Sequence, residues 1–247
     1  MIGSPRVHHR LTDSTNQRAK ELADAGALHG TLVTADEQTA GRGRQGRSWV
    51  APPGAAVLMS VVVRDLDSMA MLPLAAALAV AEAAEACAPV RCAIKWPNDV
   101  WIDRRKLSGI LVEGRPAAGW AVVGIGVNVL TPREAFPEEL RDTATSLAAA
   151  AGGEAGAGAE PLSVRATLDA LVDALDRRLE AEPEAILAAW RERDALRGER
   201  IRWDGGEGVA AGVDEDGSLL VDTDAGRVTL GAGEVHLERV NGQNPTP

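Results

Sequence analysis

The sequence predicts an α+β protein: an antiparallel sheet with amphipathic helices, followed by a small β-barrel at the C-terminus. Three observations lead to this prediction. Short strands between Arg91 and Val129 follow one another through tight turns, as in a meander. Apolar residues between Val164 and Leu179 recur at spacings of three and four, which indicates an amphipathic helix. From Arg197 onward, short strands alternate with turns that carry Gly and Asp, a pattern typical of a small barrel.

Length and composition agree with a folded protein of this size. The 247 residues allow one large domain, or a catalytic domain with a small appendage. Apolar residues make up 45% of the chain and charged residues 25%, so we expect a sizeable core and not general disorder. The change of texture places a domain boundary near Leu196. We therefore expect a large first domain over 1–196 and a small second domain over 197–247.

The charge and the apolar segments exclude several classes of protein. The net charge of −10 argues against a surface that coats nucleic acid or anionic membrane, although a local basic site remains open. Met1–Arg10 lacks the apolar run of a secretory signal. Met69–Val90 is mostly alanine, interrupted by two glutamates, and is too weakly apolar to span a membrane. Cys87 and Cys92 are expected to be buried thiols in a cytoplasmic protein.

The elements of the first half can be justified in order. Ser14–Ala25 is predicted as a helix, because Asp13 or Ser14 can cap it and Ser14 with Gln17 has the spacing of a capping box. The Gly-, Arg- and Pro-rich stretch Gly41–Gly54 is expected to be a loop. The other expected elements are strands at Thr31–Asp36 and Ala56–Val63, a helix at Pro73–Ala86, and strands at Arg91–Trp96, Val100–Asp103, Lys106–Glu113 and Trp120–Val129.

The second half begins with a low-complexity stretch. Ala148–Pro161 is almost entirely Ala and Gly and has little reason to order. The helix over Val164–Leu179 and a second helix over Pro183–Leu196 follow. The expected strands of the barrel are Arg200–Trp203, Gly208–Val213, Leu219–Thr223, Arg227–Leu230 and Glu234–Arg239.

The strongest motif is a run of glycines and arginines over residues 41–49. Its glycines let the backbone approach a ligand closely, and Arg42, Arg44 and Arg47 supply forked donors for phosphate or carboxylate. A solvated loop or an RNA-binding segment would have the same composition. The position between two core strands of an acidic protein favours an anion-binding loop.

Three further motifs carry polar groups. In Lys95–Val100, Pro97 forces a turn that presents Asn98 and Asp99, and Lys106 begins the following strand; an ordinary hairpin is an equally good explanation of this segment alone. Gly124–Val129 places two glycines inside a buried strand, which implies a close neighbour. Ser14-Thr15-Asn16 is explained by a helix cap. Of the 26 basic residues only Lys20, Lys95 and Lys106 are lysine, a bias that favours a specific need for lysine at these positions.

Together, and in this order, these four motifs closely resemble the biotin protein ligase family from about Leu11 to Val129. The resemblance implies a catalytic domain related to class II aminoacyl-tRNA synthetases, with a mixed sheet flanked by helices, and an SH3-like C-terminal domain. Some members of the family carry an N-terminal helix-turn-helix that represses transcription. Only about ten residues precede the motif-bearing helix, so we expect no such domain here.

The resemblance also implies the role of each motif residue. Lys106 and Arg44 would be catalytic, Arg47, Trp49, Asn98 and Asn128 would bind the adenylate, and Asp99 would orient either a Mg²⁺ ion or a ribose hydroxyl. The residues implied to bind biotin are Ser14, Thr15, Asn16, Gln38, Arg42, Gly43, Arg44 and Lys106.

The implied reaction uses ATP and biotin as substrates with Mg²⁺, forms biotinyl-5'-AMP, and transfers biotin to a lysine of a biotin carboxyl carrier protein of an acyl-CoA carboxylase. We expect a cytoplasmic monomer or weak homodimer without nucleic-acid or membrane partners. A lipoate protein ligase is the nearest alternative, and a nucleic-acid-binding regulator that uses the Arg-Gly loop is an alternative from another class. The low aromatic content of 3% counts against the second, because such regulators stack bases on aromatic rings. Every motif residue is present, which argues against an inactive homologue.

Overall fold

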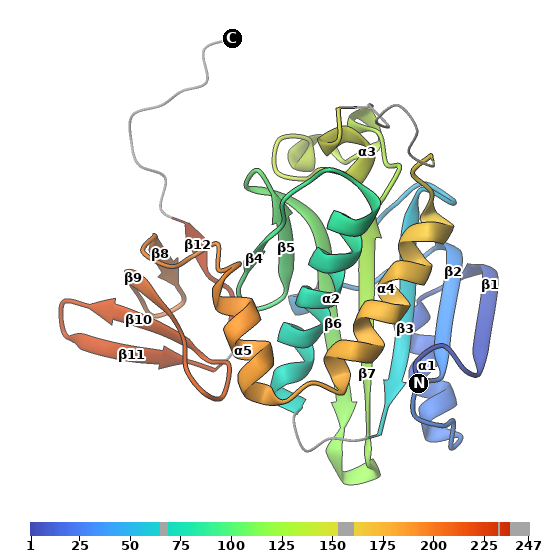
Figure 1. The fold of residues 1–247 in the computed structure, drawn as a ribbon, viewed down its shortest axis with the longest axis horizontal. Coiled ribbons are helices and arrows are strands. Elements are labelled where there is room, and N and C mark those ends of the chain that lie inside the picture. Colours follow the sequence, from blue (N-terminus) through green and yellow to red (C-terminus); the bar gives the residue numbers. More distant parts are fainter. Residues whose placement is uncertain (65–68, 153–160, 232, 238–247) are drawn as a thin grey trace.

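The structure, a computed structural model, describes residues 1–64, 69–152, 161–231 and 233–237. Two sheets organise this part of the chain, and helices cover the larger sheet on both faces (Figure 1). The α+β prediction is confirmed, and the larger sheet is mixed.

The larger sheet has seven strands in the order β1-β2-β3-β7-β6-β5-β4. Strand β1 runs parallel to β2, and the other neighbouring pairs among the described strands are antiparallel. The last four strands form the meander that the sequence predicts. The bounds are β1 Arg6–Thr12, β2 Leu32–Gln38, β3 Ala56–Val63, β4 Ala93–Lys95, β5 Asp99–Ile102, β6 Arg105–Arg115 and β7 Trp120–Asn128.

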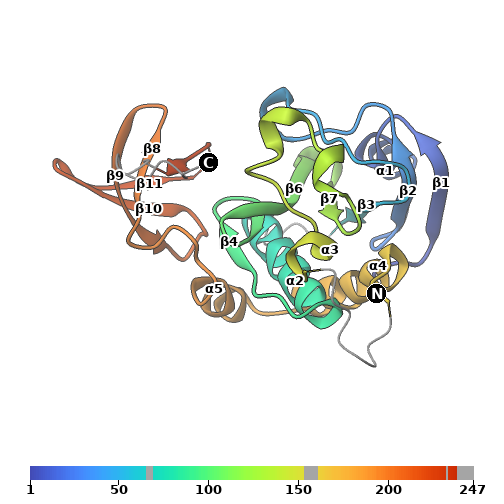
Figure 2. The same cartoon turned by 90° about the horizontal axis from the view of Figure 1, so that it is seen from above.

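The helices divide between the two faces of this sheet. Figure 2 shows α2 and α4 together on one face and α1 on the other. Because successive residues of a strand point to opposite faces, alternate residues of β3 and β7 enter two separate cores, a large one under α2 and α4 and a small one under α1. The bounds are α1 Thr15–Asp24, α2 Leu72–Cys87, α3 Leu147–Ala150, α4 Val164–Leu179 and α5 Pro183–Arg191.

The small core under α1 covers only part of its face. It joins Ala19 and Ala23 of α1 to Val33, Val62 and Val122 of the sheet. Further along the strands on the same face, glycines replace the apolar side chains, beside the N-terminus of α1. This part of the sheet is therefore left open, and the candidate site forms there.

The second sheet has five strands in the order β11-β10-β9-β8-β12. It is fully antiparallel among its described strands. Its apolar side chains, such as Ile201, Leu219 and Val235, belong to the same large core as α2 and α5. The bounds are β8 Arg200–Trp203, β9 Gly206–Val213, β10 Leu219–Thr223, β11 Gly226–Leu230 and β12 His236–Leu237.

Several expectations need correction. Arg6–Thr12 forms strand β1 at the edge of the large sheet, although we predicted no element there. The second C-terminal helix ends at Arg191, five residues earlier than expected. The predicted low-complexity connection Ala148–Pro161 lies mostly outside the described residues, and its start belongs to α3. The predicted last strand extends beyond the described residues after Leu237.

The apolar helix and the two cysteines also occupy defined places. Met69–Cys87, which contains α2, is long and apolar enough to span a membrane by length and composition. However, 67% of its apolar window is buried inside the protein, where α2 packs against the sheet. Both cysteines are free thiols; Cys92 is buried as predicted, and Cys87 is half-buried. Burial raises the pKa of the Cys92 thiol to about 12.

Candidate active site

A cavity of about 730 Å³ lies on the open part of the α1 face. This volume suits a ligand larger than a single small metabolite. The structure brings together around this cavity every residue singled out as a site candidate. These residues are Ser14, Thr15, Asn16, Gln38, Arg42, Gly43, Arg44, Arg47, Trp49, Asn98, Asp99, Lys106 and Asn128.

Three glycines explain why there is room for a cavity on this face. Gly109 of β6 pairs with Gly126 of β7, and Gly124 lies two residues earlier on β7, so that all three share one face. A Cβ atom at Gly126 would collide with the indole of Trp49, and one at Gly124 would collide with the side chain of Asn16. The predicted close neighbours of the Gly124–Val129 strand are therefore these two side chains.

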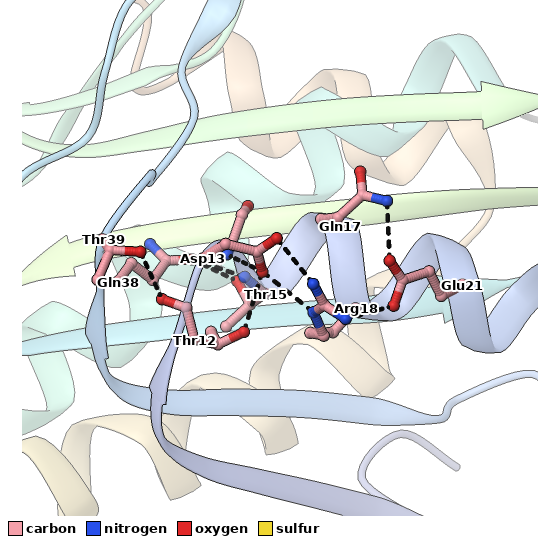
Figure 3. Close-up of polar contacts among 9 residues, drawn as sticks. Thr12, Asp13, Thr15, Gln17, Arg18, Glu21, Gln38 and Thr39 are labelled. Atoms are coloured by element: carbon pink, nitrogen blue, oxygen red, sulfur yellow. Dashed lines mark hydrogen bonds and ion pairs between the residues drawn. The ribbon is translucent and has the colours of Figure 1, made fainter.

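The N-terminus of α1 forms one end of the cavity. Figure 3 shows the polar contacts around this helix start, including those between Thr15 and Gln38. Gln38 lies at the end of β2. Its Oε1 accepts a hydrogen bond from the Thr15 backbone N–H at 2.7 Å and is within hydrogen-bond distance of the Thr15 hydroxyl, at 3.1 Å. The predicted capping box is wrong, because the Ser14 side chain makes no capping hydrogen bond and Gln17 bonds to Glu21. Ser14 lies at the cavity wall with its hydroxyl uncommitted to the helix.

A buried chain of side chains supports this end from below. Ser60 of β3, the only polar residue of that strand, is fully buried and lies 2.8 Å from the Thr15 hydroxyl and 2.6 Å from Asn16 Oδ1. Asn16 Nδ2 donates to Glu113 Oε2 at 2.9 Å, and Lys20 Nζ lies 2.6 Å from the other oxygen of Glu113. Sequence analysis missed Ser60 and Glu113, although a lone serine in an apolar strand is a recognisable signal.

The Arg-Gly loop crosses the cavity and reaches the C-terminal sheet. Arg44 donates to the Asn98 side chain and to the backbone carbonyl of Gly233, both at 3.1 Å. Arg47 forms an ion pair with Glu234 at 2.8 Å. Burial lowers the pKa of Arg44, while the nearby Asp99 charge opposes this shift. The two arginines thus tie residues 41–49 to the segment before β12, a contact that the sequence did not predict.

Arg42, in contrast, faces the other end of the site. Its guanidinium lies 3.8 Å from Glu113, and its backbone bridges to Ser48 across the loop. Gln45, between the arginines, has a φ of 55°. The loop is therefore folded back on itself, and Arg42 points to a different part of the cavity wall from Arg44 and Arg47.

Cations gather at the end of the cavity away from α1. Lys106 Nζ lies 2.7 Å from Asp99 Oδ1 and 5.9 Å from the centre of the Trp49 ring. Lys95, which we did not predict as a site residue, also lines the cavity and lies 5.4 Å from the Trp101 ring. Burial lowers the pKa of Lys95, and Asp99 partly offsets this effect. Among the residues that line the cavity, six are lysine or arginine and three are aspartate or glutamate, so the site suits an anion.

Asn98 and Asn128 are held by backbone groups. Asn98 exchanges hydrogen bonds with the backbone of Ile110, which fixes the turn after Pro97. Asn128 donates to the Thr145 carbonyl at 3.1 Å, and its buried Oδ1 has no hydrogen-bond partner among the described residues. The Trp49 indole N–H is likewise buried without a partner in this part of the chain. A buried acceptor and a buried donor that are left unpaired at a cavity wall indicate a polar ligand.

A second missed region lies after β7. Residues of the segment between Phe136 and Ala144 line the cavity. The Lys106 backbone N–H donates to the Thr143 carbonyl at 2.7 Å, and the Thr145 backbone N–H donates to the Lys106 carbonyl at 2.9 Å. No motif marks this segment in the sequence. Only the pairing of Lys106 with Ala144 in space brings it to the site.

The described residues offer no ready metal site. No group of three or more His, Cys, Asp or Glu residues in the described part of the chain is arranged to hold a metal ion. Asp99, the predicted metal-orienting residue, already has the Lys106 ammonium at 2.7 Å. The protein groups alone therefore do not fit a bound Mg²⁺ ion, which requires several oxygen ligands.

Comparison with known proteins agrees with this geometry. The biotin/lipoate A/B protein ligase family matches residues 8–129, and the biotin protein ligase C-terminal domain matches residues 204–237. A biotin–[acetyl-CoA-carboxylase] ligase of Mycobacterium tuberculosis is 36% identical over 256 residues, which cover 92% of this chain and 86% of that protein. The chain belongs to the biotin protein ligase family.

The family also contains relatives with a longer chain and solved structures with ligands. The bifunctional ligase/repressor BirA of Bacillus subtilis is 42% identical over 158 residues, and the match spans 62% of this chain and about half, 49%, of that protein. The biotin protein ligase from Aquifex aeolicus in complex with biotin and ATP has a TM-score of 0.81 and 29% identity, covering 96% of this chain and 99% of the other. The Mycobacterium tuberculosis and Aquifex aeolicus proteins are both named as biotin ligases, so neither the lipoate nor the nucleic-acid alternative is favoured.

Proposed function

We propose that this protein is an ATP-dependent biotin protein ligase that forms biotinyl-5'-AMP and transfers biotin to a lysine of a biotin carboxyl carrier protein. One observation carries the proposal: a single cavity joins a hydrogen-bonding end at Thr15 and Gln38 to a cationic end at Lys106 and Arg44. Biotin has a ureido ring at one end and a carboxylate at the other, so it needs both kinds of group in one site.

Biotin is proposed to lie with its ureido ring at the N-terminus of α1. There Thr15, Gln38, Ser14 and Asn16 supply donors and acceptors, and the glycine floor leaves room for the fused rings. Gly43 and Arg42 of the loop would close over the ligand. The carboxylate would then point toward Lys106.

The nucleotide is proposed to occupy the remainder of the cavity. The buried Oδ1 of Asn128 would accept a hydrogen bond from the exocyclic amine of adenine, and Trp49 would offer an aromatic face to the nucleotide. Asn98 holds Arg44 by a 3.1 Å hydrogen bond, and Arg47 would exchange Glu234 for phosphate oxygens. Lys95 adds a fourth cation for the phosphates that leave.

In the first step, the biotin carboxylate attacks the α-phosphorus of ATP, and the bond to the pyrophosphate oxygen breaks. Two anions must approach one another, and negative charge grows on the phosphoryl oxygens. Lys106 and Arg44 would neutralise both, a preorganised electrostatic role whose loss costs about 10² to 10³ in rate. Asp99, 2.7 Å from Lys106, positions its ammonium and, in addition, lies close enough to the cavity to meet a ribose hydroxyl.

In the second step, a neutral lysine amine of the carrier protein attacks the carbonyl carbon of the mixed anhydride, and AMP leaves. The nucleophile belongs to the partner, so the enzyme needs no covalent intermediate of its own. Mg²⁺ is proposed to arrive with ATP, bound to its phosphates, because the described residues form no metal cluster by themselves.

The remaining proposals concern the whole chain. We propose two domains, 1–196 and 197–247, the first related to class II aminoacyl-tRNA synthetases and the second an SH3-like barrel; the five-stranded antiparallel second sheet supports the latter. We also propose a cytoplasmic monomer or weak homodimer whose partner is a carrier domain of an acyl-CoA carboxylase, with no nucleic-acid or membrane partner. The free thiols and the net charge of −10 support this assignment.

A direct assay tests the function. The protein is incubated with biotin, Mg-ATP and a biotin carrier domain, and the products are blotted with streptavidin. We expect labelling of the carrier that requires both substrates and is lost when the acceptor lysine of the carrier is replaced. A lipoyl carrier domain with lipoate, probed with an antibody against lipoyl-lysine, serves as the control. Labelling of that control alone, or no labelling of the biotin carrier, would refute the proposal.

A further inference from the structure

Five side chains form a hydrogen-bonded chain beneath the α1 end of the cavity. Which of them donate and which accept can be deduced from their chemistry. The members of the chain are Thr15, Ser60, Asn16, Glu113 and Lys20, linked in this order at 2.8, 2.6, 2.9 and 2.6 Å. Apart from Thr15 and Asn16, none of these residues lines the cavity. The chain therefore acts on the ligand only through the residues that it orients.

Glu113 is the fixed point of the chain, because it is ionised. Burial opposes its ionisation, but hydrogen bonds from Lys20 and Asn16 outweigh burial and hold the pKa of Glu113 below its ordinary value. A carboxylate can only accept hydrogen bonds. The group of Asn16 that faces it must therefore be the amide NH₂, which also lies 3.3 Å from the Leu111 carbonyl, a second pure acceptor.

The direction then passes along the chain. Asn16 turns its Oδ1 to Ser60, so Ser60 must donate its single hydrogen to Asn16 and can only accept from Thr15. Thr15 then has two acceptors beside its single hydrogen, Ser60 at 2.8 Å and Gln38 Oε1 at 3.1 Å, so its hydroxyl has only lone pairs left for a ligand in the cavity.

We infer that Glu113 is a positioning residue that fixes the Thr15 hydroxyl as a hydrogen-bond acceptor toward the cavity, and thereby selects a ligand that presents an N–H group there. The neighbouring Gln38 uses its Oε1 on the Thr15 backbone N–H, which leaves its NH₂ as a donor to the ligand. An acceptor beside a donor is complementary to the N–H and C=O of a cyclic urea. This inference rests on the proposed function, because it takes biotin as the ligand.

Glu113→Gln tests the direction of the chain without changing its shape. Lys20 can only donate, so it draws the oxygen of the new amide toward itself and turns the amide NH₂ toward Asn16. Asn16 must then flip and Ser60 becomes a donor to Thr15, so only Gln38 Oε1 still competes for the Thr15 hydrogen, and the Thr15 hydroxyl is less strictly confined to accepting. The probes are biotin and its two cyclic carbamate analogues, each with a ring oxygen in place of a different ureido N–H.

Calorimetric titration measures the affinity of each probe for the enzyme without ATP. For the native protein we expect one of the two carbamates to bind about 10- to 100-fold more weakly than biotin, because its ring oxygen faces the Thr15 lone pairs. In Glu113→Gln we expect biotin to weaken by about 10-fold and this discrimination to fall by a similar factor. The KM for ATP in pyrophosphate exchange should change less than about twofold.

Two further variants separate positioning from stability. Glu85 is a matched control: its carboxylate has a side-chain exposure of 25% against 29% for Glu113, and Arg193 and the Cys92 backbone hold it away from the cavity. Glu85→Gln should lower the melting temperature without altering the discrimination. In Glu113→Gln combined with Lys20→Met, the ammonium that draws the amide oxygen away from Asn16 is gone, so the amide oxygen can turn back to Asn16 and part of the discrimination should return.

The outcomes are distinct for the two proposals. If the native protein binds biotin and Glu113→Gln discriminates between biotin and the carbamates as well as the native protein does, the inference is overturned and the ligase proposal stays intact. Equal loss of discrimination in Glu85→Gln also overturns it, because the effect would then follow stability alone. Native protein that binds no biotin overturns the ligase proposal and this inference with it.

Discussion

Lys95 lies among groups that act in opposite directions on its charge. Burial lowers its pKa, whereas Asp99 favours the charged form. At a pH below the lowered pKa, Lys95 is protonated in both the folded and the unfolded chain, and burial of its charge destabilises the fold. Between the lowered and the ordinary pKa the unfolded chain binds more protons, so this destabilisation declines as the pH rises through that window. A residue that destabilises the fold and faces an anion-binding cavity is typical of a functional site.

We therefore expect Lys95→Met to stabilise the protein and impair it. The melting temperature should rise by about 1 to 3 °C near pH 7, and the gain should shrink toward about pH 10. The KM for ATP in pyrophosphate exchange should rise by about tenfold, because a phosphate ligand is lost. Thermal unfolding at both pH values and exchange kinetics check this; a variant that is less stable and binds ATP normally would show Lys95 to be structural.

At the residue scale, the chemical role of a side chain was easier to predict from the sequence than its contacts in the fold. The motif residues line one cavity because the glycines and arginines are chemically conspicuous. Lys95 stood inside a quoted motif, yet nothing local distinguishes a lysine that faces a cavity from one on a hairpin surface. Glu113 and Ser60 were missed because their importance comes from contacts across 97 and 44 positions of the chain.

The Arg-Gly loop is an element whose closure depends on a few side-chain contacts. Arg44 holds it to Asn98 and to Gly233, and Trp49 rests on the glycine floor. A reactive adenylate must be kept from water until the carrier arrives. This loop is the part of the wall that is best placed to retain it.

Arg44→Gly should therefore release the adenylate. We expect slower adenylate formation, by about 10² at most, together with labelling of lysines on a bystander protein such as serum albumin. Streptavidin blots of albumin in the presence and absence of the carrier measure the leak. Labelling that stays confined to the carrier would show that the loop does not retain the intermediate.

At the element scale, buried strands were the most predictable. Ala56–Val63 has the predicted bounds because every residue is buried, which a continuous apolar run reports directly. Arg6–Thr12 was missed for the opposite reason: its residues are exposed or half-buried, and its conformation is set by pairing with β2 at the sheet edge. Pairing of this kind leaves no pattern in the strand's own sequence.

The whole molecule is held together by a core that both sheets share. Residues of the second sheet, such as Val213 and Val221, are buried in the same cluster as α2, and Trp96 donates a buried 3.0 Å hydrogen bond to the Gly217 carbonyl. The sequence predicted a change of architecture near Leu196. It did not predict that the segment before β12 returns to the cavity, because that contact depends on how the sheets pack.

We expect a chain that ends at Leu196 to lose its fold, although 1–196 contains the motif residues. Removal of the second sheet would expose the apolar side chains that it covers and leave the Trp96 indole N–H unpaired. Near-ultraviolet circular dichroism and thermal unfolding should show no cooperative transition, whereas the full chain should unfold in one. A truncated chain that melts cooperatively and binds biotin would mean that the sheets are energetically independent.

Biotin-dependent exchange of labelled pyrophosphate into ATP tests the central claim most directly, since it isolates adenylate formation from carrier transfer. For the native protein we expect exchange that requires biotin; for Lys106→Ala we expect a loss of about 10² to 10³ with unchanged circular dichroism and melting temperature. Undiminished exchange in that variant would contradict the role of the ammonium. Native protein without any exchange would contradict the account as a whole.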